Sequence, residues 1–234
     1  TRTIYMKLSI IIPCYNESST IVKIIDQINQ QSSIDKEIIL IDDFSTDGTR
    51  SIIEKELKNK VDQIFLNEKN HGKGYCIKKG IKKARGDMIL IQDADLEYNP
   101  SDYKNLINPI KKDIADVVYG SRFVGSAEKR VLYFWHTIGN KLLTLLSNIF
   151  TNLNLTDMEV GYKVFKTEVI KNINLEENRF GFEPEITAKI SKKKLRIYEV
   201  GISYFGRKYS EGKKITWQDG LSAIRCILKY NLFK

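Results

Sequence analysis

Short apolar runs alternate with amphipathic segments along the first half of the chain. The runs predict buried strands because they are continuous and end at turn-forming residues. They cover residues 8–12, 37–41, 63–66, 88–91 and 116–119. Between them, apolar residues recur at the three- and four-residue spacing of helices. Single helices between successive strands imply a mostly parallel sheet with right-handed crossovers. We therefore predict the α/β class, with a Rossmann-like central sheet flanked by helices.

The second half of the chain is less regular and contains two apolar stretches that could meet a membrane surface. Residues 131–150 are rich in leucine and aromatic residues, but polar residues within the stretch make it a poor membrane span. We expect an interfacial helix pair here, with a buried core helix as the alternative. Near the carboxyl end, one helical stripe contains Trp217, Leu221, Ile224, Leu228 and Leu232. This basic amphipathic helix fits a membrane surface, or docking onto the domain.

An acidic cluster follows the predicted strand 88–91. Asp93, Asp95 and Glu97 stand within five positions of one another, where open α/β sheets place their ligands. Residues two apart in an extended segment point the same way, so Asp93 and Asp95 can converge on one hard cation. The cluster therefore predicts a Mg²⁺ or Mn²⁺ site that is completed by substrate phosphates. A solvated acidic turn is the alternative.

Composition narrows the possible classes of binding partner and the expected cellular compartment. The 234 residues carry a formal net charge of +9, which indicates an anionic partner such as a nucleotide phosphate, an anionic lipid headgroup or a nucleic acid. Charge alone does not choose among them. The three cysteines are far apart and lack metal-ligand spacing, so we expect reduced thiols in a cytosolic protein. Residues 1–6 lack a secretory pattern, and Met6 is a candidate natural start.

Five motifs occur in order along the chain and together resemble a known family. They are Pro13-x-Tyr15-Asn16-Glu17, Asp42-Asp43-x-Ser45-x-Asp47-Gly48-Thr49, Gly72-Lys73-Gly74, Asp93-Ala94-Asp95 and Gly120-Ser121-Arg122-Phe123. Each motif alone is a weak signal. The ordered set resembles the family 2 glycosyltransferases with the GT-A fold, and within them the polyprenyl-phosphate sugar transferases of the dolichyl-phosphate mannose synthase type. Segments 157–163 and 207–214 extend the resemblance over nearly the whole chain. One departure is Glu97, where many dolichyl-phosphate mannose synthases have Gln.

The resemblance implies one GT-A domain with two halves. Residues 6–125 would bind the nucleotide sugar, and residues 126–234 would form an acceptor side with interfacial, amphipathic helices. The nucleotide-binding residues that it implies are Pro13, Tyr15, Glu17, Asp42, Asp43, Lys73 and Asp93. Carboxylates at strand ends can accept hydrogen bonds from ribose hydroxyls and base N–H groups. Lys73 stands in a glycine-flanked turn that suits an anion, although such turns are also common in plain loops. We expect Asp47 and Thr49 to be structural.

The resemblance also implies residues for the chemical step. They are Asp93, Asp95, Arg122, Asp157, Arg207 and Lys213. Negative charge grows on the diphosphate as it leaves, so a cation near Asp95 and positive charge from Arg207 and Lys213 would stabilise that step. Segment 207–214 has four cations and a glycine, as expected of a loop that closes over a phosphate. A solvated basic loop is the alternative.

The predicted function is sugar transfer to a lipid phosphate. An inverting enzyme would move one sugar from a UDP- or GDP-sugar to a polyprenyl phosphate, while bound peripherally at the cytoplasmic membrane face and without nucleic acid. The alternative acceptor is a glycan hydroxyl in cell-surface polysaccharide synthesis, which would need a general base. The base candidates are Asp157, Glu159 and Glu185. A non-catalytic module that binds anionic lipid is a further alternative.

Overall fold

The computed structural model describes residues 6–125, 128–131, 133–207 and 217–233. One seven-stranded sheet runs through it in the order β3-β2-β1-β4-β6-β5-β7. The strands are β1 Leu8–Cys14, β2 Lys36–Asp42, β3 Gln63–Leu66, β4 Met88–Ile91, β5 Val117–Ser121, β6 Lys163–Lys166 and β7 Ile197–Gly201. Only β6 runs antiparallel to its two neighbours, β4 and β5. The predicted α/β class with a mostly parallel sheet is confirmed.

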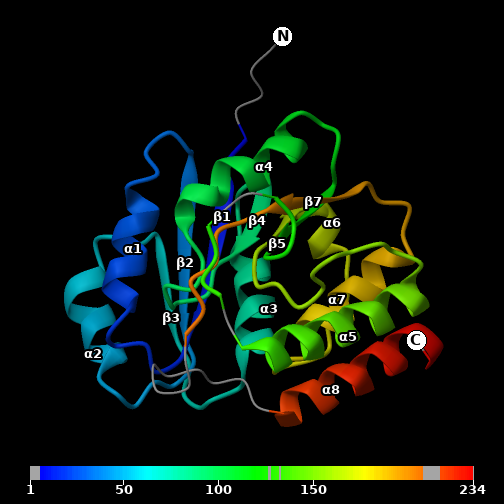
Figure 1. The fold of residues 1–234 in the computed structure, drawn as a ribbon. Helices are drawn as coiled ribbons and strands as arrows, with labels where there is room; N and C mark the ends of the chain where they lie inside the picture. Colours follow the sequence, from blue (N-terminus) through cyan, green and yellow to red (C-terminus); the bar gives the residue numbers. More distant parts are fainter. Residues whose placement is uncertain (1–5, 126–127, 132, 208–216, 234) are drawn as a thin grey trace.

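The sheet has helices on both faces (Figure 1). They are α1 Ile21–Asn29, α2 Thr49–Ile52, α3 Lys73–Lys83, α4 Tyr103–Lys111, α5 Phe134–Thr151, α6 Thr167–Lys171, α7 Phe182–Ser191 and α8 Trp217–Leu228. A π-helical turn extends α2 over Ile53–Leu57, and another extends α8 over Lys229–Phe233. Helix α1 illustrates the predicted three- and four-residue spacing of apolar residues. Its four isoleucines follow this spacing, and all of them are buried.

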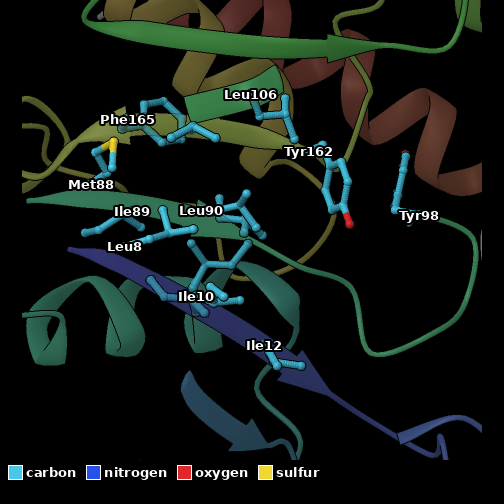
Figure 2. Packing of buried hydrophobic residues seen from close by; sticks show 14 of the residues in the cluster. Leu8, Ile10, Ile12, Met88, Ile89, Leu90, Tyr98, Leu106, Tyr162 and Phe165 are labelled. Atoms are coloured by element: carbon cyan, nitrogen blue, oxygen red, sulfur yellow. The ribbon is translucent and has the colours of Figure 1, made fainter. Parts of the chain in front are cut away.

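The core lies at the central strands. Figure 2 shows Leu8 and Ile10 of β1 beside Ile89 and Leu90 of β4, with Phe165 of β6 on the far side. All five side chains are fully buried. Burying a side chain of this size contributes about 1.5–3 kcal/mol relative to leaving it exposed. These strands therefore form a rigid base for the polar residues that follow their carboxyl ends.

Two strands in the second half of the chain were not predicted. Strand β6 contains lysine at both ends, and Lys163 is buried despite its charge. Strand β7 is an edge strand that leaves its side chains partly exposed, so it lacks a continuous buried run. Both strands join the same sheet as the strands of residues 6–125, so the two predicted halves share one sheet.

From Phe134 onward, the apolar stretch of residues 131–150 lies in one helix, α5, and not in the expected helix pair. Helix α5 contacts α7 and α8, and α8 runs beside it in Figure 1. The buried-core alternative is also wrong, because Trp135, Leu142 and Ile149 are 77%, 60% and 67% exposed. Neither helix could span a bilayer: within the described ranges, no helix is both long and apolar enough to do so.

Candidate functional site

The carboxyl ends of four strands bring the candidate residues to one edge of the sheet. Strands β1, β2, β4 and β5 all point toward this edge. Glu17 follows β1, Asp43 follows β2, Asp95 follows β4 and Arg122 follows β5. Polar groups at the ends of parallel strands are close in space although they are far apart in sequence. The sheet thus assembles most of the predicted site.

Three carboxyl groups surround the guanidinium of Arg207. Its Nη2 lies 2.5 Å from Asp95 Oδ2, and its Nη1 lies 3.2 Å from Glu17 Oε2. Glu97 Oε1 accepts a hydrogen bond from the Arg207 backbone N–H at 2.9 Å and lies 3.4 Å from Arg207 Nε. Tyr204 donates to the other Glu97 oxygen. Arg207 therefore occupies the centre of the predicted cation site, whereas Lys213, its predicted companion, lies outside the described residues.

This carboxylate cluster has the chemistry of a hard-cation site. Burial, and then the negative charges of Asp93 and Glu97, raise the pKa of Asp95 to about 7 against the opposing effect of Arg207. A divalent cation would relieve this crowding, as the guanidinium does here. In the part of the chain that the structure describes, no three His, Cys, Asp or Glu side chains converge to hold a metal by themselves. Mg²⁺ commonly takes one or two carboxylates and completes its shell with phosphates and water. Asp95 and Glu97 fit such a set.

Asp93 faces a different cation from Asp95. Its Oδ1 lies 2.8 Å from Lys73 Nζ, which is also 3.1 Å from Glu183 Oε1 on α7. A Cβ at Gly161 would lie 2.5 Å from Asp93 Oδ2, so only glycine permits this close approach. Asp93 and Asp95 therefore contact different cations, Lys73 and Arg207. Strand β4 ends at Ile91, so the two residues lie beyond its extended segment. Lys73 is thus a partly buried partner of the acidic motif.

Among the residues predicted to hold the nucleoside, Asp42 has a carboxylate oxygen that accepts no hydrogen bond from the described residues. Asp42 is fully buried, and its Oδ2 is bound by Arg50, but its Oδ1 has no hydrogen-bond partner in the described part of the chain. Asp43 instead accepts backbone N–H groups of His71 and Gly72. Asp42 Oδ1 is therefore a buried acceptor that the described residues leave unsatisfied, whereas Asp43 shapes the turn before α3.

The other residues of the nucleotide motifs also fall into two groups: some can meet a ligand, and others have structural roles. Tyr15 is 39% exposed at the end of β1, so its ring can meet a ligand, while Pro13 lies within β1. Asp47 accepts bonds from the backbone and hydroxyl groups of Thr49. These bonds agree with the structural role expected for Asp47 and Thr49.

Arg122 and Asp157 form a forked ion pair. Arg122 Nε and Nη2 lie 2.6 and 2.7 Å from the two Asp157 carboxylate oxygens, and the Arg122 backbone N–H also donates to Asp157. The Asp157 side chain is fully buried, and the guanidinium stacks 5.2 Å from the Tyr204 ring centroid. Such a pair fixes the guanidinium in direction and leaves Asp157 little freedom to accept a proton.

We predict that Asp157→Asn destabilises the fold, because it leaves the largely buried guanidinium of Arg122 without its countercharge. Removing one partner of a buried pair costs about 3–5 kcal/mol, and thermal unfolding should therefore shift down by about 10 °C. Asp113→Asn is a matched control, because Asp113 pairs with Arg196 at an exposed site. Its unfolding temperature should stay nearly unchanged. Equal shifts of the unfolding temperature in both variants would show that the Arg122–Asp157 pair contributes no more to stability than an exposed ion pair.

Several residues at the site were missed by sequence reasoning. Glu183 pairs with Lys73, Arg50 binds Asp42, and Lys163 lies buried with its ammonium group 4.9 Å from the Tyr119 ring centroid. The available signal was a lysine inside the apolar run from Tyr162 to Phe165, which an ordinary buried strand would exclude. Glu185, one of the base candidates, instead accepts the backbone N–H groups of residues 176 and 177 and pairs with Lys189.

The family of the chain follows from comparison with known sequences. The model of the family described as Glycosyl transferase family 2 matches residues 9–173. That match covers more than half of the chain, and the chain belongs to this family. The resemblance drawn from the ordered motifs is thereby confirmed.

Characterised relatives include transferases that act with lipid phosphates. A dolichol-phosphate mannosyltransferase of Pyrococcus furiosus is 28% identical over 212 residues, which cover 89% of this chain and 59% of the relative. A dolichyl-phosphate beta-glucosyltransferase of Trichomonas vaginalis is 28% identical over 227 residues, which cover 87% of this chain and 68% of the relative. The chain thus spans only part of the length of each.

Solved structures confirm the GT-A fold. Glucosyl-3-phosphoglycerate synthase from Mycobacterium tuberculosis, in complex with Mn²⁺, UDP and phosphoglyceric acid, has a TM-score of 0.77 at 17% identity and covers 98% of this chain and 80% of its own. Mannosyl-3-phosphoglycerate synthase from Rubrobacter xylanophilus has a TM-score of 0.73 at 19% identity, covering 96% and 73%. At these identities the likeness concerns the fold alone.

Proposed function

We propose that the protein transfers one sugar from a nucleotide-diphosphate sugar to a polyprenyl phosphate at a membrane surface, with inversion at the anomeric carbon. An acceptor phosphate oxygen would attack that carbon as its bond to the leaving diphosphate oxygen breaks. The bonding electrons would then pass to the diphosphate. A phosphate monoester is largely ionised at neutral pH, so the attack needs no general base.

Residues at the strand ends supply the donor side of this proposal. Asp42 Oδ1 would accept a base N–H or a ribose hydroxyl, since it is buried without another partner among the described residues. Asp95 and Glu97 would hold Mg²⁺ or Mn²⁺, which when bound neutralises charge on the leaving diphosphate. Arg207 would then turn from the carboxylates to the diphosphate oxygens. The base could be uracil or guanine, because both offer N–H donors.

The observation that carries the choice of a lipid acceptor is the exposed apolar face of helix α5, whose opposite face packs Leu143, Leu146 and Phe150 against the core. Its fully or nearly buried side chains are polar, namely Thr144, Ser147 and Thr151. Its large apolar side chains Trp135, Leu142, Leu145 and Ile149 are exposed. Soluble domains rarely expose a group of large apolar side chains on one helix. A helix with this arrangement gains stability when its exposed face enters an apolar phase.

Neighbouring α8 also exposes large apolar side chains and extends the apolar surface. Trp217 is 74% exposed, Leu221 57% and Leu232, in the turn that follows α8, 55%. The two helices are in contact, so their exposed faces can lie on one bilayer surface. The chain also carries a net charge of +9, which favours anionic headgroups. Peripheral association with the cytoplasmic membrane face and a long apolar acceptor both agree with this surface.

A glycan hydroxyl remains the second candidate acceptor, and it would require a carboxylate base. Asp157 is held by Arg122, and Glu185 is held by two backbone N–H groups and Lys189. Neither carboxylate is well placed to take a proton. This leaves Glu159, whose side chain makes no hydrogen bond to the described residues through its buried oxygen. A non-catalytic lipid-binding module would leave the buried Asp42 acceptor and the carboxylate cluster unexplained.

A competition experiment tests the choice between the two acceptors. A short polyprenyl phosphate and a soluble oligosaccharide would be supplied together with radiolabelled UDP- and GDP-sugars in separate reactions containing Mn²⁺. We expect label on the prenyl phosphate with one of the donors. Label on the oligosaccharide alone would contradict the proposal and favour the hydroxyl acceptor.

We predict that the apolar face of α5 drives membrane association. Replacing Leu145 and Ile149 by serine should cut partitioning onto anionic liposomes at least about 100-fold, because each side chain contributes about 2 kcal/mol when buried. Ile114→Ser is the control, since Ile114 is also exposed but lies beyond α4. Flotation in a density gradient measures binding. Equal flotation of the double variant and the control would place the membrane contact elsewhere.

A further inference from the structure

A cavity of about 380 Å³ lies at the carboxyl end of α7. One side is lined by residues that follow α6, among them Asn172, Asn174 and Glu176. The other side is lined by Lys189, Lys192 and Lys193. Strand β7 begins shortly after Lys193 and runs parallel to β5, so its amino end lies at the sheet edge opposite to the candidate site. The cavity is therefore separate from the carboxylate cluster.

The acidic side chain of this lining is already neutralised. Glu176 lies 3.5 Å from Lys189 Nζ and 3.4 Å from Lys229 Nζ. Lys189 also pairs with Glu185 at 2.6 Å, one helical turn away. These pairs belong to a network of three carboxylates and three cations, namely Glu176, Glu177, Glu185, Lys189, Arg225 and Lys229. The network as a whole therefore adds no net charge to the cavity.

Lys192 and Lys193 bring positive charge to the cavity that no carboxylate compensates. Both side chains are exposed, and neither forms a salt bridge within the part of the chain that the structure describes. Lys192 Nζ instead donates a hydrogen bond to the backbone carbonyl of Tyr230 at 2.6 Å. A concave surface with two uncompensated ammonium groups attracts an anion. Its volume is within the range of small-ligand sites.

Exposed apolar side chains stand next to this positive charge. The hydrogen bond from Lys192 ends on the π-helical turn Lys229–Phe233, and α7 contacts this turn beside α8 (Figure 1). Within the turn, Leu232 is 55% exposed and Phe233 is 80% exposed. An inorganic anion would use the lysines alone. A ligand with an anionic head and an apolar tail matches both features.

We propose that this cavity binds the headgroup of an anionic phospholipid, with Lys192 and Lys193 at the phosphate and with Leu232 and Phe233 against the acyl chains. An ammonium group binds phosphate as a compact point charge. The lipid is neither donor nor acceptor, and it fixes how α8 lies on the bilayer. The site shares the membrane surface with the proposed function but uses none of the residues assigned to sugar transfer.

Flotation on two kinds of vesicle tests this site. Lys192→Gln/Lys193→Gln should lower partitioning onto vesicles of phosphatidylcholine with phosphatidylglycerol about 30-fold, because each lysine at an anionic surface contributes about fivefold. Partitioning onto phosphatidylcholine alone should be unchanged. Lys193→Gln by itself keeps the bond from Lys192 to Tyr230, and it should cause a loss of about fivefold. Thermal unfolding checks that both variants are folded.

The matched control is Lys111→Gln/Lys112→Gln. These lysines are also adjacent and exposed at the carboxyl end of a helix, α4, which lies away from α8 in Figure 1. Because charges distant from the bilayer are screened, the control should change partitioning less than about twofold. Added salt should abolish the preference of wild type for phosphatidylglycerol and leave its binding to phosphatidylcholine.

Two results would overturn the site. Equal partitioning of the two double variants onto phosphatidylglycerol vesicles would show that the cavity lysines have no special role. Calorimetric binding of inorganic phosphate that is lost in Lys193→Gln, with flotation unchanged, would identify a site for a free anion. Transfer to farnesyl phosphate without vesicles tests the proposed function separately. If wild type transfers no sugar there, the proposed function fails, and flotation still decides the headgroup site.

Discussion

Replacing Asp95 by asparagine should lower turnover about 10³-fold while the fold persists. Asp95 Oδ2 is the oxygen that Arg207 contacts at 2.5 Å, and it lies in the most crowded group of carboxylates at the strand ends. Asparagine keeps the shape but removes the charge that would bind the divalent cation. Losing about 4 kcal/mol of transition-state stabilisation corresponds to such a decrease.

Two measurements accompany this prediction. Calorimetric titration with UDP or GDP should show that Mn²⁺ strengthens nucleotide binding to wild type but not to Asp95→Asn. Asp26→Asn serves as the control, because Asp26 lies on an exposed part of α1 and pairs with Lys60. Metal-dependent turnover in Asp95→Asn at the wild-type level would remove Asp95 from the cation site.

The second large effect should come from Arg207→Ala. Its guanidinium contacts the same Asp95 oxygen that a metal would need, so we expect the nucleotide-free variant to bind Mn²⁺ about tenfold more tightly than wild type. Turnover should nevertheless fall about 10²-fold, because the charge that would meet the leaving diphosphate is lost. Mn²⁺ binding is measured by electron paramagnetic resonance and turnover by sugar transfer.

Arg207→Lys provides the matched variant for this effect. Lysine keeps the positive charge but lacks the planar fork that contacts Glu17 and Asp95 together. It should recover part of the turnover and weaken Mn²⁺ binding relative to Arg207→Ala. If Mn²⁺ binding and turnover are both at wild-type levels in Arg207→Ala, Arg207 contributes neither to the cation site nor to turnover.

The first half of the fold was predictable because its pattern is repetitive. Continuous apolar runs such as 88–91 predict buried strands because they are short and are bounded by turn residues. Parallel strands bring their carboxyl ends to one edge. That reasoning located Asp95 and Arg122 correctly at the strand ends. It could not find β6, because an antiparallel strand with a buried lysine breaks the pattern.

Contacts made by tertiary packing were also beyond the sequence pattern. Arg207 meets Glu17 across 190 positions, and nothing local to either residue specifies that pairing. The different cation partners of Asp93 and Asp95 also come from tertiary packing, because Lys73 and Arg207 are both distant in sequence from the two carboxylates. Glu183 reaches the site because α7 packs near Lys73, which no spacing in the sequence indicates.

The chemical nature of the product tests the account most directly. Wild type and Asp95→Asn would be incubated with liposomes that contain a polyprenyl phosphate, the labelled nucleotide sugar that wild type accepts, and Mn²⁺. We predict a labelled product in the lipid phase, with wild type only, whose sugar is linked to phosphate with inverted anomeric configuration. A wild-type product that is confined to the aqueous phase, or a sugar linked through a glycan hydroxyl, would contradict the account.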